Sequence, residues 1–236
     1  MKCVLLAGGL GVRLRPLTYA IPKPLLPVGE HPILEEIVIR LKGFGLREVI
    51  IAVGYRAELI ETYFQDGAQL GVQIEYAHES EPLGTAGPLA LVRKQFGDTA
   101  RESDSLLVMN GDLLTEIDMR SLIDFHEEGG NDVTVVTRDF QLKHPYGVIE
   151  LDGDHITSVV EKPTVIDIIN AGIYMFRWSA LDLVPTGQPF EMPDLLNAAV
   201  DSGLTVRAYP FAGAWLAIDR MEQLEEGARI LAAFHE

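Results

Sequence analysis

The sequence predicts a single α/β domain built on a mixed, mostly parallel sheet. In the first half of the 236-residue chain, short apolar runs take turns with segments of helical periodicity, a pattern typical of parallel strands joined by helices. Several of these runs lack strict alternation of apolar and polar residues, as expected of strands covered on both faces. Beyond residue 112 alternation increases and an Asp152-Gly153 turn lies between strand-like runs, which indicates antiparallel strands.

The elements of the first half follow from apolar periodicity. Runs at 2–8, 48–55, 72–79 and 105–112 are predicted strands ended by turn residues. The segment 31–45 predicts a helix, with Pro32 in its first turn and Gly45 at its end. A second helix is predicted over 57–67. The apolar stripes of the two helices are Ile33, Ile37, Leu41 and Phe44, and Leu59, Ile60, Tyr63 and Phe64.

The second half is predicted to carry antiparallel strands and a closing helix. Strand-like runs occur at 132–139, 146–162 and 169–176, and a helix is expected from about residue 220 to 234. We find no internal repeat or linker, so we expect one domain over 1–236. Within it, 1–115 would mainly bind one substrate and 116–236 the other.

Charge and composition exclude several classes of function. Nineteen basic and 35 acidic residues give a formal net charge of -16, which argues against nucleic acid or an anionic membrane as a partner. The apolar run at the start is too short for a signal peptide or a membrane span, so we expect a cytoplasmic protein. Cys3 is the one cysteine, and its place in an apolar run predicts a packed thiol.

A glycine-rich turn follows the first predicted strand. Gly8, Gly9 and Gly11 lie at the carboxyl edge of the predicted sheet, where free N–H groups can approach phosphate oxygens. The turn does not match the dinucleotide-binding motif, because Leu14 stands where its third glycine belongs, and no Gly-Lys-Ser/Thr of a P-loop occurs in the chain. Its distinguishing cations are Arg13 and Lys23, each framed by proline.

These motifs resemble those of the sugar-nucleotide pyrophosphorylases, which join a nucleoside triphosphate to a sugar 1-phosphate and release pyrophosphate. The resemblance covers nearly the whole chain and comes closest to mannose-1-phosphate guanylyltransferases. It implies a Rossmann-like three-layer α/β/α sandwich. The matching segments, in order, are AGGLGVRLRPLT, PKPLLPVG, EPLGTAGPL (81–89), NGDLL (110–114), VEKP (160–163) and NAGIY (170–174).

The resemblance implies a catalytic role for three cations. Arg13 would grip the β- and γ-phosphates and stabilise the departing pyrophosphate, since a guanidinium matches phosphate geometry. Lys23 would act from the other side of the α-phosphate, and Lys162 would hold the sugar phosphate. The nucleophile is already anionic near neutral pH, so positioning and charge neutralisation are the main tasks.

Asp112 is the candidate ligand for Mg²⁺, because it ends a predicted buried strand at the ligand edge of the sheet. Here the chain departs from the family pattern. The resemblance implies Trp-x-Asp-Ile-Gly toward the C-terminus, with its aspartate as second ligand, whereas this chain has WLAIDR with Ala217 at that place. Asp219 can partly replace the missing carboxylate or serve as N-cap of the last helix, and we favour the cap.

The resemblance also implies which residues contact the base and the sugar. GTP is favoured, because Glu79 can accept both the N1–H and the amino hydrogens of guanine. The motifs leave open which hexose or heptose is bound. The nucleotide-binding residues would be Leu6, Ala7, Gly8, Gly9, Gly11, Glu79, Pro82, Gly84 and Thr85, and the sugar-binding residues Gly147, Glu161, Asn170 and Gly172.

Three alternatives stay open at this point. One is a thymidylyl-, uridylyl- or adenylyltransferase acting on glucose 1-phosphate or a related sugar or cyclitol phosphate. Another, suggested by Ala217, is a regulatory subunit that binds nucleotide sugars with weak catalysis. An oxidoreductase of the dinucleotide-binding type is disfavoured by its missing motif. The partners expected are a nucleoside triphosphate, a sugar 1-phosphate and a second copy of the chain, with the oligomeric state open.

Overall fold

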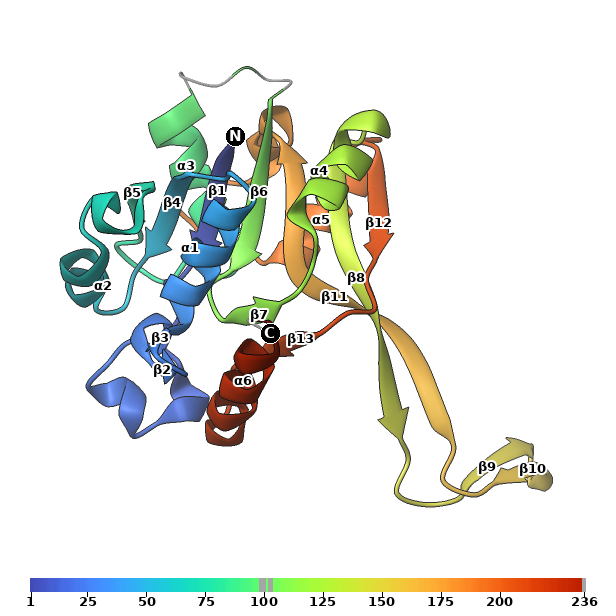
Figure 1. The fold of residues 1–236 in the computed structure, drawn as a ribbon. Helices are drawn as coiled ribbons and strands as arrows, with labels where there is room; N and C mark the ends of the chain where they lie inside the picture. Colours follow the sequence, from blue (N-terminus) through green and yellow to red (C-terminus); the bar gives the residue numbers. More distant parts are fainter. Residues whose placement is uncertain (98–100, 102–103, 235–236) are drawn as a thin grey trace.

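The computed structural model describes residues 1–97, 101 and 104–234, and its centre is a seven-stranded sheet (Figure 1). The strand order is β12-β8-β11-β6-β1-β4-β5. The bounds of these strands are β1 Lys2–Leu6, β4 Glu48–Val53, β5 Gln73–His78, β6 Ser105–Asn110, β8 Val133–Lys143, β11 Thr164–Arg177 and β12 Val206–Pro210.

One strand of this sheet runs against the others. β1 pairs in parallel with β4 and β6, and β4 with β5. β11 is antiparallel to both β6 and β8, whereas β12 is parallel to β8. β8 and β12 therefore run in the same direction as β1, and β11 alone is reversed. The predicted mixed, mostly parallel sheet is confirmed.

Helices cover both faces of the sheet. Successive residues of β1 point to opposite faces, so Cys3 and Leu5 pack with α1 (Ile33–Gly43), α2 (Ala57–Phe64), α4 (Met119–Glu128) and α6 (Met221–Phe234). Val4 packs on the other side with α3 (Pro88–Phe96) and α5 (Met192–Asp201). This arrangement is a three-layer α/β/α sandwich, as expected from the resemblance.

The predicted helices are correct in place but differ at their ends. α1 begins at Ile33, because Pro32 is extended and pairs in a short ladder of β2 (Pro27–Val28) with β3 (His31–Pro32). α2 ends at Phe64 rather than at 67, because Gln65 leaves the helical conformation. α6 begins at Met221. Fraying at helix ends depends on local capping, which periodicity does not report.

β8 and β11 continue beyond the body as a two-stranded ribbon, which Figure 1 shows extending away from the helices. At its end lie β9 (Val148–Asp152) and β10 (His155–Val160), an antiparallel hairpin that turns at Gly153. The predicted hairpin is thus confirmed. We call the segment from Arg138 to Ile169 the arm, because burial is lost from these two residues outward.

Two further features concern the cysteine and the length of the apolar helices. Cys3 is fully buried, and burial raises the pKa of its thiol to about 12, so the expected packed thiol is confirmed. In the described part of the chain, no helix is both long enough and apolar enough to cross a membrane.

Candidate active site

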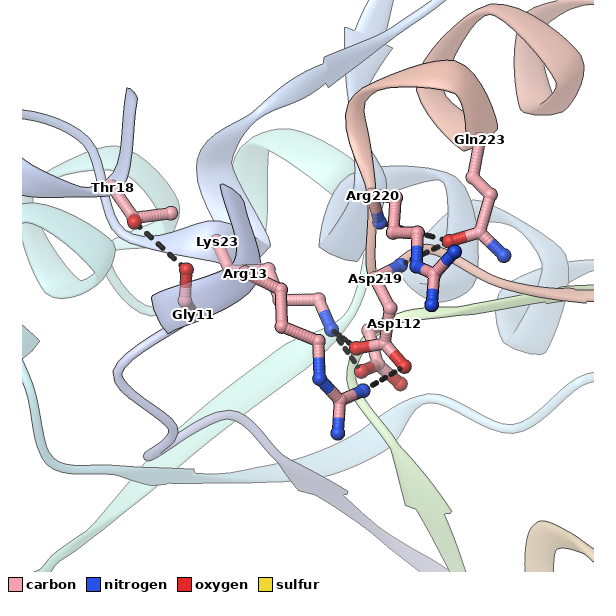
Figure 2. Close-up of polar contacts among 8 residues, drawn as sticks. All are labelled: Gly11, Arg13, Thr18, Lys23, Asp112, Asp219, Arg220 and Gln223. Atoms are coloured by element: carbon pink, nitrogen blue, oxygen red, sulfur yellow. Dashed lines mark hydrogen bonds and ion pairs between the residues drawn. The ribbon is translucent and has the colours of Figure 1, made fainter. Parts of the chain in front are cut away.

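The glycine-rich turn leaves β1 at the carboxyl edge of the sheet and wraps around one side of it. Three single-turn 3₁₀ helices, η1 (Val12–Leu14), η2 (Leu17–Tyr19) and η3 (Lys23–Leu25), shape this loop. The Thr18 hydroxyl donates to the Gly11 carbonyl at 2.8 Å, which ties the two halves of the loop together (Figure 2). η1 and η3 thereby bring Arg13 and Lys23 to the same side.

Two cations and two carboxylates meet at this edge, as Figure 2 shows. Lys23 Nζ donates to Asp112 Oδ2 at 2.5 Å and to Asp219 Oδ1 at 2.9 Å. Arg13 Nη1 donates to Asp219 Oδ2 at 2.8 Å. The Lys23 side chain is only 12% exposed, whereas that of Arg13 is 70% exposed. Lys23 is therefore the buried centre of the cluster, and Arg13 contacts Asp219 from the solvent side.

Asp219 belongs to this cluster rather than to the helix cap that we favoured from the sequence. Its two carboxylate oxygens accept from Lys23 and Arg13. The N–H groups of Asp219 and Arg220 are satisfied instead by Oε1 of Gln223, each at 2.8 Å. Burial favours a raised pKa for Asp219, but the hydrogen bond and charge of Lys23, together with Arg13, lower it overall.

A short ladder holds the two carboxylates together. β13 (Trp215–Ala217) pairs with β7 (Leu113–Thr115), and Ile218 N–H donates to the carbonyl of Asp112 at 3.0 Å. Ala217 lies opposite Leu113 and contributes no ligand. Asp112 Oδ1 is buried without a hydrogen-bond partner, a costly state for a carboxylate oxygen that an incoming cation would relieve.

Two cavities share walls at this cluster. One of about 260 Å³ is lined by the loop from Leu6 to Leu14 with Lys23, Asp112 and Asp219. The other, of about 310 Å³, also contains Leu6, Gly9 and Asp112 and extends toward the 79–88 segment. Together they bring together all the predicted nucleotide-binding residues: Leu6, Ala7, Gly8, Gly9, Gly11, Glu79, Pro82, Gly84 and Thr85.

Glu79 projects over the glycine turn. A Cβ built on Gly8 would lie 2.0 Å from Glu79 Oε1, so only glycine permits this approach. Oε2 of Glu79 accepts from the N–H of Leu83 at 3.0 Å. Burial raises the pKa of Glu79, against the effect of that hydrogen bond. The carboxylate is therefore positioned at the wall of the larger cavity, with Oε1 facing the loop.

Sequence reasoning missed three residues of the larger cavity, Pro88, Asn110 and Glu191. Pro88 lies within the quoted EPLGTAGPL motif. Asn110 ends β6 within the quoted NGDLL motif, so its position carried a signal. Glu191 comes from the start of α5, more than a hundred residues away from Thr85, and no local pattern marks it. Its Oε2 accepts from the hydroxyl of Thr85 at 2.7 Å and from the N–H of Thr85 at 3.1 Å.

The four predicted sugar-binding residues separate into two groups. Asn170 and Gly172 lie on β11 beside the larger cavity, because a Cβ on Gly172 would meet Asn110 Nδ2 at 2.7 Å. Asn170 Oδ1 accepts from the N–H of Gly172 at 2.9 Å, and its amide donates to the Tyr174 hydroxyl at 2.7 Å.

The other group lies at the end of the arm, apart from the cavities. Gly147 and Glu161 are there with Lys162, and a Cβ on Gly147 would contact Glu161 Oε2 at 3.0 Å. Lys162 Nζ lies 3.8 Å from Glu161 Oε1, and the Lys162 backbone has a φ of 46°. Neither cavity at the glycine loop includes any of these three residues. The structure thus separates Lys162 from Arg13 and Lys23.

The fold and the site define an α/β protein with a glycine-rich loop and a lysine-bridged carboxylate pair at the carboxyl edge of its sheet. A family model described as nucleotidyl transferase matches residues 2–233. The chain therefore belongs to the nucleotidyl transferase family.

Similar proteins carry related names. The chain is 41% identical over 232 residues to the mannose-1-phosphate guanylyltransferase catalytic subunit beta of Danio rerio, covering 96% of this chain and 63% of the relative. It is 34% identical to a UTP–glucose-1-phosphate uridylyltransferase of Synechocystis (97% and 63% covered). It is also 34% identical to the mannose-1-phosphate guanylyltransferase of Mycobacterium tuberculosis (97% and 64% covered). The chain spans slightly less than two thirds of these relatives.

Solved structures share the fold. A Bacillus anthracis protein assigned as a glucose-1-phosphate thymidylyltransferase superposes with a TM-score of 0.78 at 24% identity, covering 98% of this chain and 94% of the other. HddC of Yersinia pseudotuberculosis gives a TM-score of 0.74 at 25% identity, covering 98% and 99%.

Proposed function

We propose that the protein transfers a nucleotidyl group from a nucleoside triphosphate, GTP by preference, to a sugar 1-phosphate of mannose or heptose type. The observation that carries this proposal is the cluster of Arg13, Lys23, Asp112 and Asp219, which opens into the cavity that holds Glu79. The relatives' names agree with this chemistry.

In the proposed reaction, an oxygen of the sugar phosphate attacks the α-phosphorus. A new P–O bond forms, the bond to the bridging oxygen of the β-phosphate breaks, and pyrophosphate departs with its electron pair. Lys23 is held rigidly by its two carboxylates and would neutralise charge at the α-phosphate. Arg13, mostly exposed, would exchange Asp219 for the phosphates of the leaving group, which suits a forked guanidinium.

The residues present fit a divalent cation. Asp112 offers a buried oxygen without a partner, and Asp219 lies across the same lysine. No group of three or more His, Cys, Asp or Glu that could hold a metal occurs in the described part of the chain, so substrate oxygens and water would complete the ligand shell. Mg²⁺, when bound, supplies positive charge to the phosphate oxygens during transfer. Asp112 and Asp219 would orient it.

Base choice is assigned to Glu79. A carboxylate at the wall of the larger cavity can accept from two neighbouring N–H donors of guanine, whereas uracil and thymine offer no such pair. Thr85, fixed by Glu191, would set the position of the segment that faces the base. On the sugar side, Asn170 and Gly172 would face the hydroxyls next to Asn110.

The division of the chain is proposed to follow this chemistry, with 1–115 mainly binding the nucleotide and 116–236 mainly the sugar phosphate within one domain. Asp219 and Glu191 cross that division, because they complete the nucleotide cavities from the second half. We propose that the protein acts in the cytoplasm on these two small substrates.

Pyrophosphate release tests the proposal. GTP, UTP, dTTP, ATP and CTP are each paired with mannose, glucose and heptose 1-phosphates, with Mg²⁺ present. Turnover is expected with GTP and a mannose- or heptose-type phosphate, and Arg13→Ala should lower it by about 10²- to 10³-fold. Lys94→Ala, on the exposed side of α3, is the matched control. No release with any pair would contradict the proposed function.

A further inference from the structure

The arm is a ribbon with apolar side chains exposed on both faces. Leu142 pairs with Val165, and Gln141 with Ile166, so residues of alternating position face opposite sides. Ile166 is 58% exposed and Ile168 75%. Twelve large apolar side chains are exposed on the arm: Phe140, Leu142, Tyr146, Val148, Ile149, Leu151, Ile156, Val159, Val160, Val165, Ile166 and Ile168. A two-stranded ribbon is marginally stable alone, and apolar surface of this extent marks an interaction site.

The arm does not cover its own cavities. Its ladder is continuous from the Asn170–Thr137 pair to the Thr164–Lys143 pair, and His144 N–H donates to the carbonyl of Pro163 at 2.9 Å. A bend within the ribbon would break these bonds. Figure 1 shows the ribbon and β9–β10 directed away from the body.

Each copy of the chain therefore has one cavity without an arm end and one arm end without a cavity. A second copy of the same chain supplies one arm end for the cavity and one cavity for the arm end. When two copies exchange arms around a two-fold axis, both cavities and both arm ends are paired and the assembly is closed. The arm has about thirty residues, close to the 20–30 residues a side of a standard interface. Lys162, with its positive φ, lies at the end that would enter the partner.

We propose that two copies exchange arms, so that the apolar faces of each arm are buried by the partner. The end of each arm then brings Lys162 and Glu161 to the partner's cavity, where they complete the sugar-phosphate site. The exchange follows from the arm itself, whereas the role of Lys162 rests on the proposed function.

Mass measurement by light scattering tests the exchange without any activity assay. The wild type is expected at twice the chain mass of 26.0 kDa, and Ile168→Asp on the arm at the mass of one chain. Val200→Asp is the matched control, because Val200 is 58% exposed on α5, away from the arm. A single-chain mass for the wild type, or an unchanged mass for Ile168→Asp, would overturn the exchange.

Complementation tests the delivery of Lys162. Arg13→Ala has a defective cavity and an intact arm, whereas Lys162→Ala has an intact cavity and a defective arm. Each variant alone should therefore lose most of its activity. Co-expressed in equal amounts, half of the dimers are mixed and each has one complete site. Recovery to about a quarter of wild-type activity is expected. No recovery, or full activity of Lys162→Ala alone, would overturn it. A wild type inactive with every substrate pair would contradict the proposed function and leave the mass result standing.

Discussion

The side chain of Asp219 is held in the charged cluster by contacts with Lys23 and Arg13, which its position in the sequence does not reveal. Lys23 and Arg13 hold both of its carboxylate oxygens and lower its pKa, so it stays ionised at neutral pH next to Asp112. Gln223 takes over the cap of the last helix and frees the aspartate for this role. A carboxylate two residues beyond Ala217 thus shares Lys23 with Asp112, where we propose that a metal ion binds.

Removing that carboxylate should weaken metal binding. Asp219→Ala is expected to raise the Mg²⁺ concentration for half-maximal pyrophosphate release by about tenfold, since one of the two proposed protein ligands is lost. The readout is a Mg²⁺ titration at saturating substrate, with Asp182→Ala at the exposed Arg93 pair as control. Ala217→Asp should shift the titration the other way. Equal titrations for Asp219→Ala and wild type would exclude Asp219 as a ligand.

Glu79 is the residue expected to discriminate between bases. Glu79→Gln should lower kcat/KM for GTP by roughly 10- to 100-fold, because one good paired contact contributes about 1–3 kcal/mol of discrimination. Activity with UTP should change much less. Rates with the two triphosphates are compared for Glu79→Gln and for Glu81→Gln, whose side chain is exposed. A parallel loss with both triphosphates would mean that Glu79 positions the loop without reading the base.

Among the elements, β11 changes character at Gly172. Outward from Asn170 the strand is arm, and inward from Ala171 it is buried sheet. Gly172 has a φ of 74° and interrupts the pairing of β11 with β8 between Asn170 and Tyr174. This irregularity lets β11 pass beside Asn110, so the same glycine connects the sheet, the cavity wall and the base of the arm.

Gly172→Ala should therefore cost stability and disturb the cavity. A Cβ there meets Asn110 at 2.7 Å in addition to the backbone strain, so we expect a loss of about 2–4 kcal/mol in the free energy of unfolding. Gly187→Ala isolates the strain, because Gly187 has a φ of 72° and nothing within 4 Å of its Cβ position. Urea denaturation of both variants checks the difference. If both variants lost the same free energy of unfolding, the Asn110 side chain would have moved away from the added Cβ without a cost in stability.

The glycine loop illustrates how short elements position charge. η1, η2 and η3 are single turns with little stability of their own, and the Thr18 hydrogen bond to Gly11 links η2 to the start of η1. The two cations of the loop are ten residues apart in sequence, yet both reach Asp219. A loop that carries its cations on tied turns can orient them before the substrate arrives, which lowers the entropy that binding must overcome.

At the scale of the whole molecule, acid should destabilise the fold through His126. Its ring is fully buried, with Nδ1 2.9 Å from Thr134 Oγ1 and Nε2 3.1 Å from Ser105 Oγ. Burial, reinforced by the charge of Arg177, lowers its pKa to about 4. The unfolded chain gains a proton near pH 6.5 and the folded chain only near pH 4, so stability falls as the pH drops through this window.

The expected loss is about 2 kcal/mol in the free energy of unfolding between pH 7 and pH 5. Urea denaturation at the two pH values should show it in the wild type and in His155→Gln, whose side chain is 89% exposed. His126→Gln should show a smaller difference between the two pH values. The same pH dependence in His126→Gln would mean that other groups govern acid stability.

Much of the architecture was predictable from the sequence because it depends on local periodicity. Both-face burial of β1, β4 and β6 appears as unbroken apolar runs, and the Asp152-Gly153 turn marks the β9–β10 hairpin. The ends of the helices were less predictable. Pro32 was predicted in the first helix but belongs to β3, and α2 ends at Phe64 instead of residue 67. The residues predicted to bind the nucleotide cluster in short motifs, and all of them line the two cavities.

The sequence alone determined the main strands of the sheet other than β12, the helices α1, α2 and α6, the glycine loop with Arg13 and Lys23, and Asp112 directly after β6. It did not predict α3, α4 or α5. Only the tertiary structure decided that Asp219 joins Lys23, that Glu191 holds Thr85, and that Lys162 lies on the arm away from the cavities. The physical reason is the distance along the chain over which each interaction acts. Periodicity and turn chemistry act over a few residues, whereas these contacts join segments that are brought together only when the sheet is assembled.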